Sequence, residues 1–144
     1  MKVDVQTEIV INASIDVVSA FAADPKNAPL WYKNIDSADW KGDKAVKIGN
    51  RVAFRARFLS RTLEYEYEII DYEPNKRLVM STAHGPFPME TTYEWSEAGD
   101  GTKMKLRNRG MPTGFNILMA PLMRLAIRRA NLKDLKLLKC ILEN

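Results

Sequence analysis

Apolar and polar side chains alternate along the first twelve residues of the chain. One parity carries apolar side chains and a threonine: Val3, Val5, Thr7, Ile9 and Ile11. The intervening positions from 4 to 8 are polar. Successive side chains of a β-strand point to opposite faces, so a period of two is typical of a strand with one buried face. The pattern predicts a strand over residues 2–12.

Two short helices are predicted to follow this strand. One face of residues 14–24 is apolar at helical spacing: Val17, Val18, Phe21 and Ala22. We expect Ser14 to act as the N-cap, its hydroxyl accepting a hydrogen bond from an amide of the first turn. A second helix is predicted from Pro25 to residue 33, because proline suits a first helical turn, where its missing amide hydrogen would have had no partner.

About six further strands are predicted between residues 35 and 110. Turn-forming residues divide this segment, and alternation is clearest over 51–59, 62–73, 87–96 and 102–109. The short connections make neighbouring strands antiparallel and exclude a doubly wound parallel sheet, which needs longer helical crossovers. We expect the outward arginines of 51–59 to pair with the outward glutamates of 62–73.

A long amphipathic helix is predicted from Phe115 to Leu142. Leucines recur at intervals of three or four residues, with one gap of seven: Leu118, Leu122, Leu125, Leu132, Leu135, Leu138 and Leu142. We expect Pro121 to kink this helix or to mark a restart. A joint containing Gly110, Pro112 and Gly114 lets the helix cross the sheet.

These elements predict a cavity. Six or seven strands spaced about 4.8 Å apart make a flat sheet near 30 Å wide, whereas a helix with its side chains is only about 10 Å wide. The sheet must therefore curl around the helix or leave a gap that can hold a ligand. We predict one α+β domain over residues 1–144, with a curved antiparallel sheet around the C-terminal helix.

Large adaptable side chains are expected to line this cavity. The predicted ligand-binding residues are Trp31, Phe54, Phe58, Tyr65, Tyr67, Met80, Met89, Tyr93, Trp95, Met104, Leu118, Leu122 and Leu125. Methionine fills irregular space, while Tyr and Trp add a polar tip to a large apolar area. Each of them taken singly is more commonly core filler, so the prediction rests on the architecture. Asn108 shares the parity of Met104 and Leu106, and either offers an amide inside the cavity or has already left the sheet.

The order of elements resembles the START-like (SRPBCC) helix-grip superfamily, in particular its polyketide cyclase/dehydrase-like branch. The most specific segment runs from Gly85 to Glu143 and includes GPFPMETTYEWSEAGDGTKMKLRNRG. The resemblance implies a helix-grip fold with a pocket between the sheet and the C-terminal helix. Across the superfamily such pockets hold lipids, polyketides, quinones and other small apolar molecules, so binding or transport of one is the expected function.

Charge, cysteine content and the lack of a long apolar run narrow the expected partners, chemistry and location of the protein. The chain carries 22 Lys and Arg against 18 Asp and Glu, a net charge of +4. Without a dense basic patch or a recognisable module, no nucleic-acid partner is expected. The single Cys140 cannot form an internal disulfide, and it is expected to pack rather than react. A cytoplasmic location is expected because neither a signal-peptide profile nor a long apolar run is present.

Catalytic chemistry has two weak candidates, His84 and Arg129. His84 is the only histidine and lies at a predicted strand end, where a histidine more commonly faces solvent. Arg129 lies close to the leucine stripe, but such an arginine more commonly extends to the surface. One histidine and one cysteine cannot supply a closed zinc site, so no metal is expected. No GxSxG, GxxxxGK or GxGxxG motif occurs, and no cofactor is expected.

The sequence leaves several alternatives open. A cyclase/dehydrase-type enzyme, using His84, Arg129 or a pocket tyrosine, is less favoured than a carrier, because an apolar pocket with few polar groups suits binding. Membrane contact through basic residues of the long helix is a third hypothesis, and it is less favoured than a purely solubilising role for them. These residues are Arg124, Arg128, Arg129, Lys133, Lys136 and Lys139. Monomer and homodimer are both compatible with the leucine pattern.

Overall fold

One antiparallel sheet of seven strands organises the chain. The computed structural model describes residues 3–58, 60–111 and 119–144. The strands are β1 (Val3–Ile11), β2 (Ile35–Trp40), β3 (Arg51–Phe58), β4 (Arg61–Glu73), β5 (Arg77–His84), β6 (Met89–Ala98) and β7 (Gly101–Gly110). Their order across the sheet is β1-β7-β6-β5-β4-β3-β2. The helices are α1 (Ile15–Ala23), the 3-10 helix η1 (Pro25–Asn27), α2 (Ala28–Trp31) and α3 (Ala120–Glu143).

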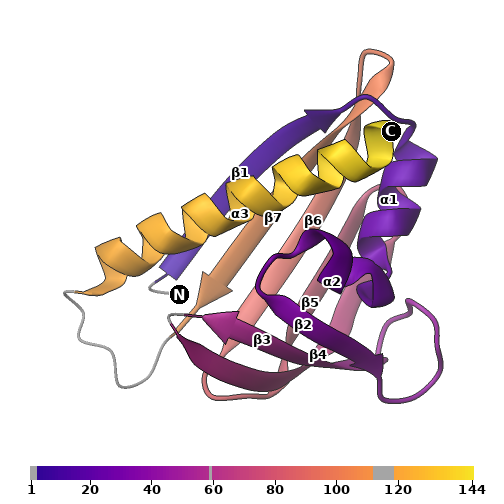
Figure 1. The fold of residues 1–144 in the computed structure, drawn as a ribbon. Helices are drawn as coiled ribbons and strands as arrows, with labels where there is room; N and C mark the ends of the chain where they lie inside the picture. The colour runs from indigo at the N-terminus through magenta and orange to yellow at the C-terminus, as the bar shows by residue number, and fades with distance from the viewer. Residues whose placement is uncertain (1–2, 59, 112–118) are drawn as a thin grey trace.

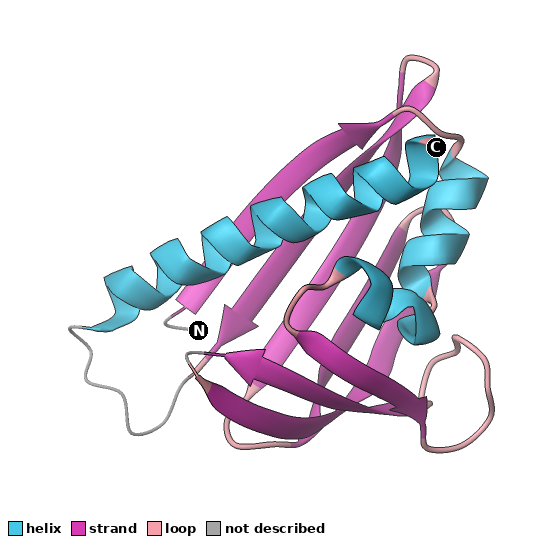
Figure 2. Ribbon diagram, in the orientation of Figure 1, coloured by secondary structure: helices cyan, strands magenta, loops and turns pink. Residues whose placement is uncertain are grey.

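The helices all lie on the concave side of the sheet, with α3 running along β1 and β7 (Figure 1). Strands β2, β3 and β4 curl toward the same side, so the sheet wraps partly around the helix (Figure 2). This arrangement confirms the predicted α+β helix-grip fold with seven strands. None of the described helices is long and apolar enough to span a bilayer.

The period of two decides which face of each strand is buried. Val5 and Ile11 in β1 are fully buried, whereas Glu8 between them is exposed. In β4, Tyr67 is buried and Glu64 is exposed. Burying the apolar parity keeps the charged parity in water at no cost in desolvation, so the predicted inner and outer faces are confirmed.

Cross-strand ion pairs fix the outer face of β3 and β4. Arg51 faces Glu68 and Arg55 faces Glu64 in the strand register. Their side chains meet at 3.2 Å from Arg51 Nε to Glu68 Oε1 and at 2.7 Å from Arg55 Nη2 to Glu64 Oε1. Exposed pairs of this kind contribute at most about 1 kcal/mol each. They confirm the predicted pairing and favour one register over its neighbours.

The short helices differ from the prediction in their caps. Ser14 occupies the N-cap position of α1, but its hydroxyl makes no capping hydrogen bond, so that expectation is wrong. The side chain that caps is Asp24, whose carboxylate accepts from the backbone amide of Lys26 at 3.0 Å. Pro25 begins η1, and the predicted second helix divides there into a 3-10 turn and α2. This turn places Trp31, which is fully buried, against the sheet.

Helix α3 presents a different face to the sheet from the one its leucines predict. Leu135 and Leu138 are fully buried, but Leu122, Leu125 and Leu132 are 59%, 46% and 38% exposed. The N-terminal half turns inward a line spaced by three and four residues: Met123, Ile127, Ala130, Asn131 and Asp134. The leucines pass from the outer to the inner face between Leu132 and Leu135, three residues apart, after the gap of seven. The prediction was therefore wrong for this half of the helix.

Two further sequence expectations concern α3. Pro121 lies in the first turn of α3, where a missing amide hydrogen needs no partner, so it does not kink the described helix. The predicted start at Phe115 and the joint residues Pro112 and Gly114 fall outside the described residues. Cys140 is exposed, so the expectation that it packs is wrong.

The start of strand β7 lies very close to the end of β1 at Gly101. A Cβ atom on Gly101 would lie 2.5 Å from the carbonyl oxygen of Ile11. Beside it, the buried Thr102 donates its hydroxyl to the carbonyl of Ala13 at 2.8 Å. Backbone atoms cannot yield to an added methyl as a flexible side chain can. Gly101 thus lets the two strands close.

Replacing Gly101 with alanine is expected to lower the free energy of unfolding by about 1–3 kcal/mol, because the added methyl forces the two strands apart. Urea unfolding measures the loss. The matched control is Gly99→Asn in the same turn, where φ is +61° and no heavy atom lies within 4 Å of the added Cβ. Asparagine adopts this left-handed conformation readily, so little change is expected there. An equally small loss in both variants would contradict the close approach.

Candidate ligand-binding cavity

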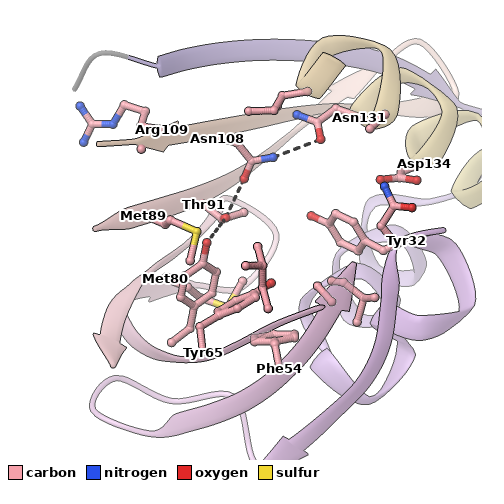
Figure 3. A pocket seen from close by; sticks show the side chains of 18 of the residues that line it. Tyr32, Phe54, Tyr65, Met80, Met89, Thr91, Asn108, Arg109, Asn131 and Asp134 are labelled. Atoms are coloured by element: carbon pink, nitrogen blue, oxygen red, sulfur yellow. Dashed lines mark hydrogen bonds between the residues drawn. The ribbon is translucent and has the colours of Figure 1, made fainter. Parts of the chain in front are cut away.

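A cavity of about 190 Å³ lies between the concave face of the sheet and α3. Figure 3 shows its walls, with Phe54 and Tyr65 on one side, Met89 and Asn108 on another, and Asn131 of α3 above. The wall opposite the sheet is made by α3 and by the segment that follows α2, from which Tyr32 points inward. The curl of β2, β3 and β4 keeps this part of the sheet away from the helix, which leaves the space open.

Six of the thirteen residues predicted as ligand-binding line this cavity: Phe54, Tyr65, Tyr67, Met80, Met89 and Tyr93. They come from four successive strands and share the buried parity of each. Their contact with a ligand stays a prediction. Asn108, which the strand parity also placed on the inner face, lines the cavity as well.

The other predicted residues lie elsewhere. Trp31, Trp95 and Met104 are buried in the core, packed in one cluster that includes residues of α1 and the C-terminal half of α3. The strand parity of Trp95 and Met104 was predicted correctly, but at this end the helices cover the sheet and fill the space. Leu122 and Leu125 face outward on α3. Leu118 and the side chain of Phe58 fall outside the described part of the chain.

Both weak catalytic candidates lie outside the cavity. The side chain of His84 is 74% exposed at the end of β5, and its Nε2 lies 3.9 Å from Glu66 Oε2. Arg129 is exposed on α3, one position away from the inward-facing Ala130. Neither residue belongs to the lining. Among the described residues, no cluster of His, Cys, Asp and Glu is arranged to hold a metal ion.

Aromatic rings form one rigid wall of the cavity. Phe54 and Tyr65 stack with ring centroids 5.4 Å apart, and Tyr67 lies 5.6 Å from Phe54 in an edge-to-face arrangement. On the opposite side the hydroxyls of Tyr32 and Tyr93 meet at 2.7 Å. Such contacts hold each ring in place and present a large apolar area with few polar atoms.

A chain of hydrogen bonds runs along one wall of the cavity, from the sheet to α3. The Tyr67 hydroxyl lies 3.0 Å from Thr91 Oγ1, and Thr91 donates to Asn108 Oδ1 at 2.7 Å. Asn108 Nδ2 then donates to Asn131 Oδ1 at 3.2 Å (Figure 3). All four residues line the cavity. These residues form a polar wall where the sheet meets α3, in contrast to the aromatic wall.

Asp134 adds an ionisable group to this polar wall. It is only 3% exposed, and its Oδ1 accepts from the backbone amide of Lys33 at 3.1 Å. Burial raises the pKa of Asp134 to about 6, although the amide bond and the charge of Lys33 act in the opposite direction. Burial also raises the pKa of Tyr67 to about 12 and that of Tyr65 well above 10. At neutral pH the tyrosines stay protonated while Asp134 is mostly ionised.

Three lining residues were not predicted from the sequence as ligand-binding: Thr91, Asn131 and Asp134. Thr91 shares the parity of Met89 and Tyr93, so the strand alternation places it on the inner face of the sheet. Asn131 and Asp134 fall on the same helical face as Met123 and Ile127, but polar side chains argue against an inward face when leucines are available nearby. Choosing the inward face of α3 by hydrophobicity alone therefore selected leucines that face outward.

Comparison with known proteins places this geometry in a wider group. A family model described as polyketide cyclase / dehydrase and lipid transport matches residues 2–143. Among similar solved structures, TTHA0849 from Thermus thermophilus shares 20% identity with a TM-score of 0.80, and 94% of each chain is covered. A START superfamily protein from Mycobacterium smegmatis shares 12% identity with a TM-score of 0.77, and 97% of each chain is covered.

A third similar structure is the di-domain ARO/CYC StfQ from the steffimycin biosynthetic pathway. It shares 10% identity with a TM-score of 0.77, and the match covers 98% of this chain and 50% of StfQ. No protein of curated function matches the chain by sequence. At these identities the solved structures establish a common fold.

The buried Asp134 carboxyl is expected to make stability depend on pH. Its folded pKa of about 6 lies above the ordinary value of 3.8, so the stability that its protonated form contributes is lost as pH rises from about 4 to about 6. Asp134→Asn keeps an acceptor for the Lys33 amide but cannot ionise. This variant should unfold with a free energy higher by on the order of 1–3 kcal/mol at neutral pH, measured in urea.

The matched control is Asp100→Asn, which alters an exposed carboxylate in the turn between β6 and β7. Unfolding is followed from pH 4 to neutral in the native protein and both variants. Only Asp134→Asn should remove the fall in stability across this interval. If both variants keep the native pH profile, Asp134 ionises as readily as a surface aspartate.

Proposed function

The chain belongs to the polyketide cyclase/dehydrase and lipid transport family, as its resemblance predicted, and we propose that it binds one small, largely apolar molecule in the cavity beneath α3. The observation that carries this proposal is the cavity of about 190 Å³ with aromatic and methionine walls. The surface that lines this space is mostly apolar, and covering apolar surface with a ligand removes it from water, which favours binding.

Cavity size sets the scale of the ligand. An apolar cavity of about 150 Å³ is enough to hold benzene. The space here therefore suits a molecule with one or two rings, or a short aliphatic chain. Met80 and Met89 lie in the wall, and their unbranched side chains can move aside for a larger molecule.

Binding is better supported than the alternative, a cyclase/dehydrase-type enzyme acting on a ligand in the same cavity. Burial raises the pKa of Tyr65 and Tyr67 further above neutral, which makes them poor proton donors, and His84 and Arg129 lie outside the cavity. Among the described lining residues, Asp134 is the only carboxylate, and an enzyme would depend on it as acid and base. Orientation of an apolar molecule needs no such proton transfer.

The primary experiment is native mass spectrometry of the purified protein, with a parallel sample after denaturing extraction. A retained small molecule that disappears on extraction is the expected result, and its mass gives the chemical class. The absence of any retained molecule would be followed by titration with naphthalene, observed by NMR of the ligand. No saturable binding in either experiment would overturn the proposal.

Filling the cavity should abolish this binding without unfolding the protein. Ala130 lines the cavity, so Ala130→Phe places a ring in the space and should weaken naphthalene binding at least about tenfold. The matched control is Arg129→Phe, which adds the same ring on the exposed side of α3 and should bind as the native protein does. Thermal unfolding of both variants verifies the fold. Equal affinity in the two variants would place the naphthalene site elsewhere.

A further inference from the structure

The hydrogen-bond chain across the cavity ends on an amide that has no acceptor. Asn131 is 4% exposed, and its Nδ2 has no hydrogen-bond partner among the described residues. Folding without an acceptor costs the full desolvation of this N–H group. Because Asn131 lines the cavity, a ligand atom could supply the missing acceptor.

The direction of this chain follows from the orientation of the Asn108 and Asn131 amides in the structure. Thr91 has a single hydroxyl hydrogen, which it donates to Asn108 Oδ1. Tyr67 must therefore donate to Thr91, and Asn108 Nδ2 donates to Asn131 Oδ1. Turning only the Asn131 amide would set two N–H groups against each other. The free group at the end of the chain is a donor.

A hydrogen-bond acceptor lies on the same face of α3 as this donor. Asp134 follows Asn131 by three residues and lies on the same face of α3, so their side chains are neighbours. The Lys33 amide bonds Asp134 Oδ1, and no hydrogen bond from the described residues reaches Oδ2. Figure 3 shows both side chains at the helix side of the cavity, with Asn131 beside Asn108 and Asp134 beside Tyr32. Asn131 offers a hydrogen-bond donor, and Asp134 offers a hydrogen-bond acceptor.

We propose that Asn131 and Asp134 form a hydroxyl-binding subsite, in which the ligand oxygen accepts from Asn131 Nδ2 and its hydrogen is donated to the Asp134 carboxylate. The subsite rests on the proposed function, and it assigns the ligand to a chemical class: an apolar molecule that carries an alcohol or a phenol. The aromatic wall holds the body of the ligand, and the subsite fixes which end meets α3.

Other polar groups fit this pair less well. A ligand carboxylate would lie beside Asp134, and two like charges repel strongly in a site with little water. An ether accepts from Asn131 but has no hydrogen for Asp134. A plain hydrocarbon leaves both polar groups without a partner.

Four naphthalenes of similar size test the subsite in the native protein near neutral pH: naphthalene, 2-methoxynaphthalene, 2-naphthol and 2-naphthoate. Binding is measured by NMR of each ligand. We expect 2-naphthol to bind about 5- to 10-fold more tightly than naphthalene, the methyl ether to fall between them, and the carboxylate to bind most weakly. Without a subsite the order reverses, because the hydroxyl loses water and gains nothing in an apolar cavity.

Two variants assign the preference to its residues. Asn131→Leu should keep or improve naphthalene binding while removing the advantage of 2-naphthol. Asp134→Asn should reduce that advantage to the level of the methyl ether and should relieve the exclusion of 2-naphthoate. The control is Arg129→Leu, on the exposed side of α3, with the native order of affinities. If Asn131→Leu does not fold, the native series and Asp134→Asn still decide.

The outcomes separate this subsite from the proposed function. Naphthalene binding equal to or tighter than that of 2-naphthol in the native protein overturns the subsite and leaves apolar binding standing. An unchanged preference for 2-naphthol in both variants overturns the assignment to Asn131 and Asp134. Failure of all four probes to bind overturns both, since the cavity then holds no small aromatic molecule.

Discussion

The pairing of β1 with β7 is the constraint on which the rest of the molecule depends. It aligns Val3 with Gly110 and Ile11 with Thr102, so the two strands run together along their whole length. An ion pair on the outer face, with Arg107 Nη2 2.6 Å from Asp4 Oδ2, joins residues 103 positions apart in the sequence. Helix α3 lies against this pair of strands. Without the pairing of β1 with β7, α3 would have no surface to pack against, and the cavity would lose the wall that α3 forms.

Sequence patterns predicted the sheet far better than the cavity. The period of two is a direct consequence of strand geometry, and it correctly identified the inner residues of β1 and β4. The Arg–Glu pairing of β3 with β4 followed from the same alternation. Helix α3 gave a misleading pattern, because an inward face that carries Asn131 and Asp134 is less hydrophobic than the line of Leu122 and Leu125. Residues that break the expected pattern are where a binding site can reside.

The polar wall is costly to the folded state. Asp134 is buried with a raised pKa, and Asn131 holds an amide hydrogen without an acceptor. Leucine at 134 would remove the buried carboxyl but leave the Lys33 amide without this acceptor, and leucine at 131 would do the same to Asn108 Nδ2. An empty cavity adds a further cost, since its lining loses contacts on one side. Binding sites commonly carry local costs of this kind, which the rest of the fold offsets.

The sheet order also has a consequence for synthesis on the ribosome. Strands β2 to β7 follow one another both in sequence and in the sheet, so each can pair as soon as its neighbour emerges. Strand β1 emerges first, yet among the described strands it pairs with β7 alone. Until then it presents unpaired backbone groups, the feature that makes edge strands prone to association with other chains. Charged residues at alternate positions, such as Asp4 and Glu8, lower this hazard while β1 waits.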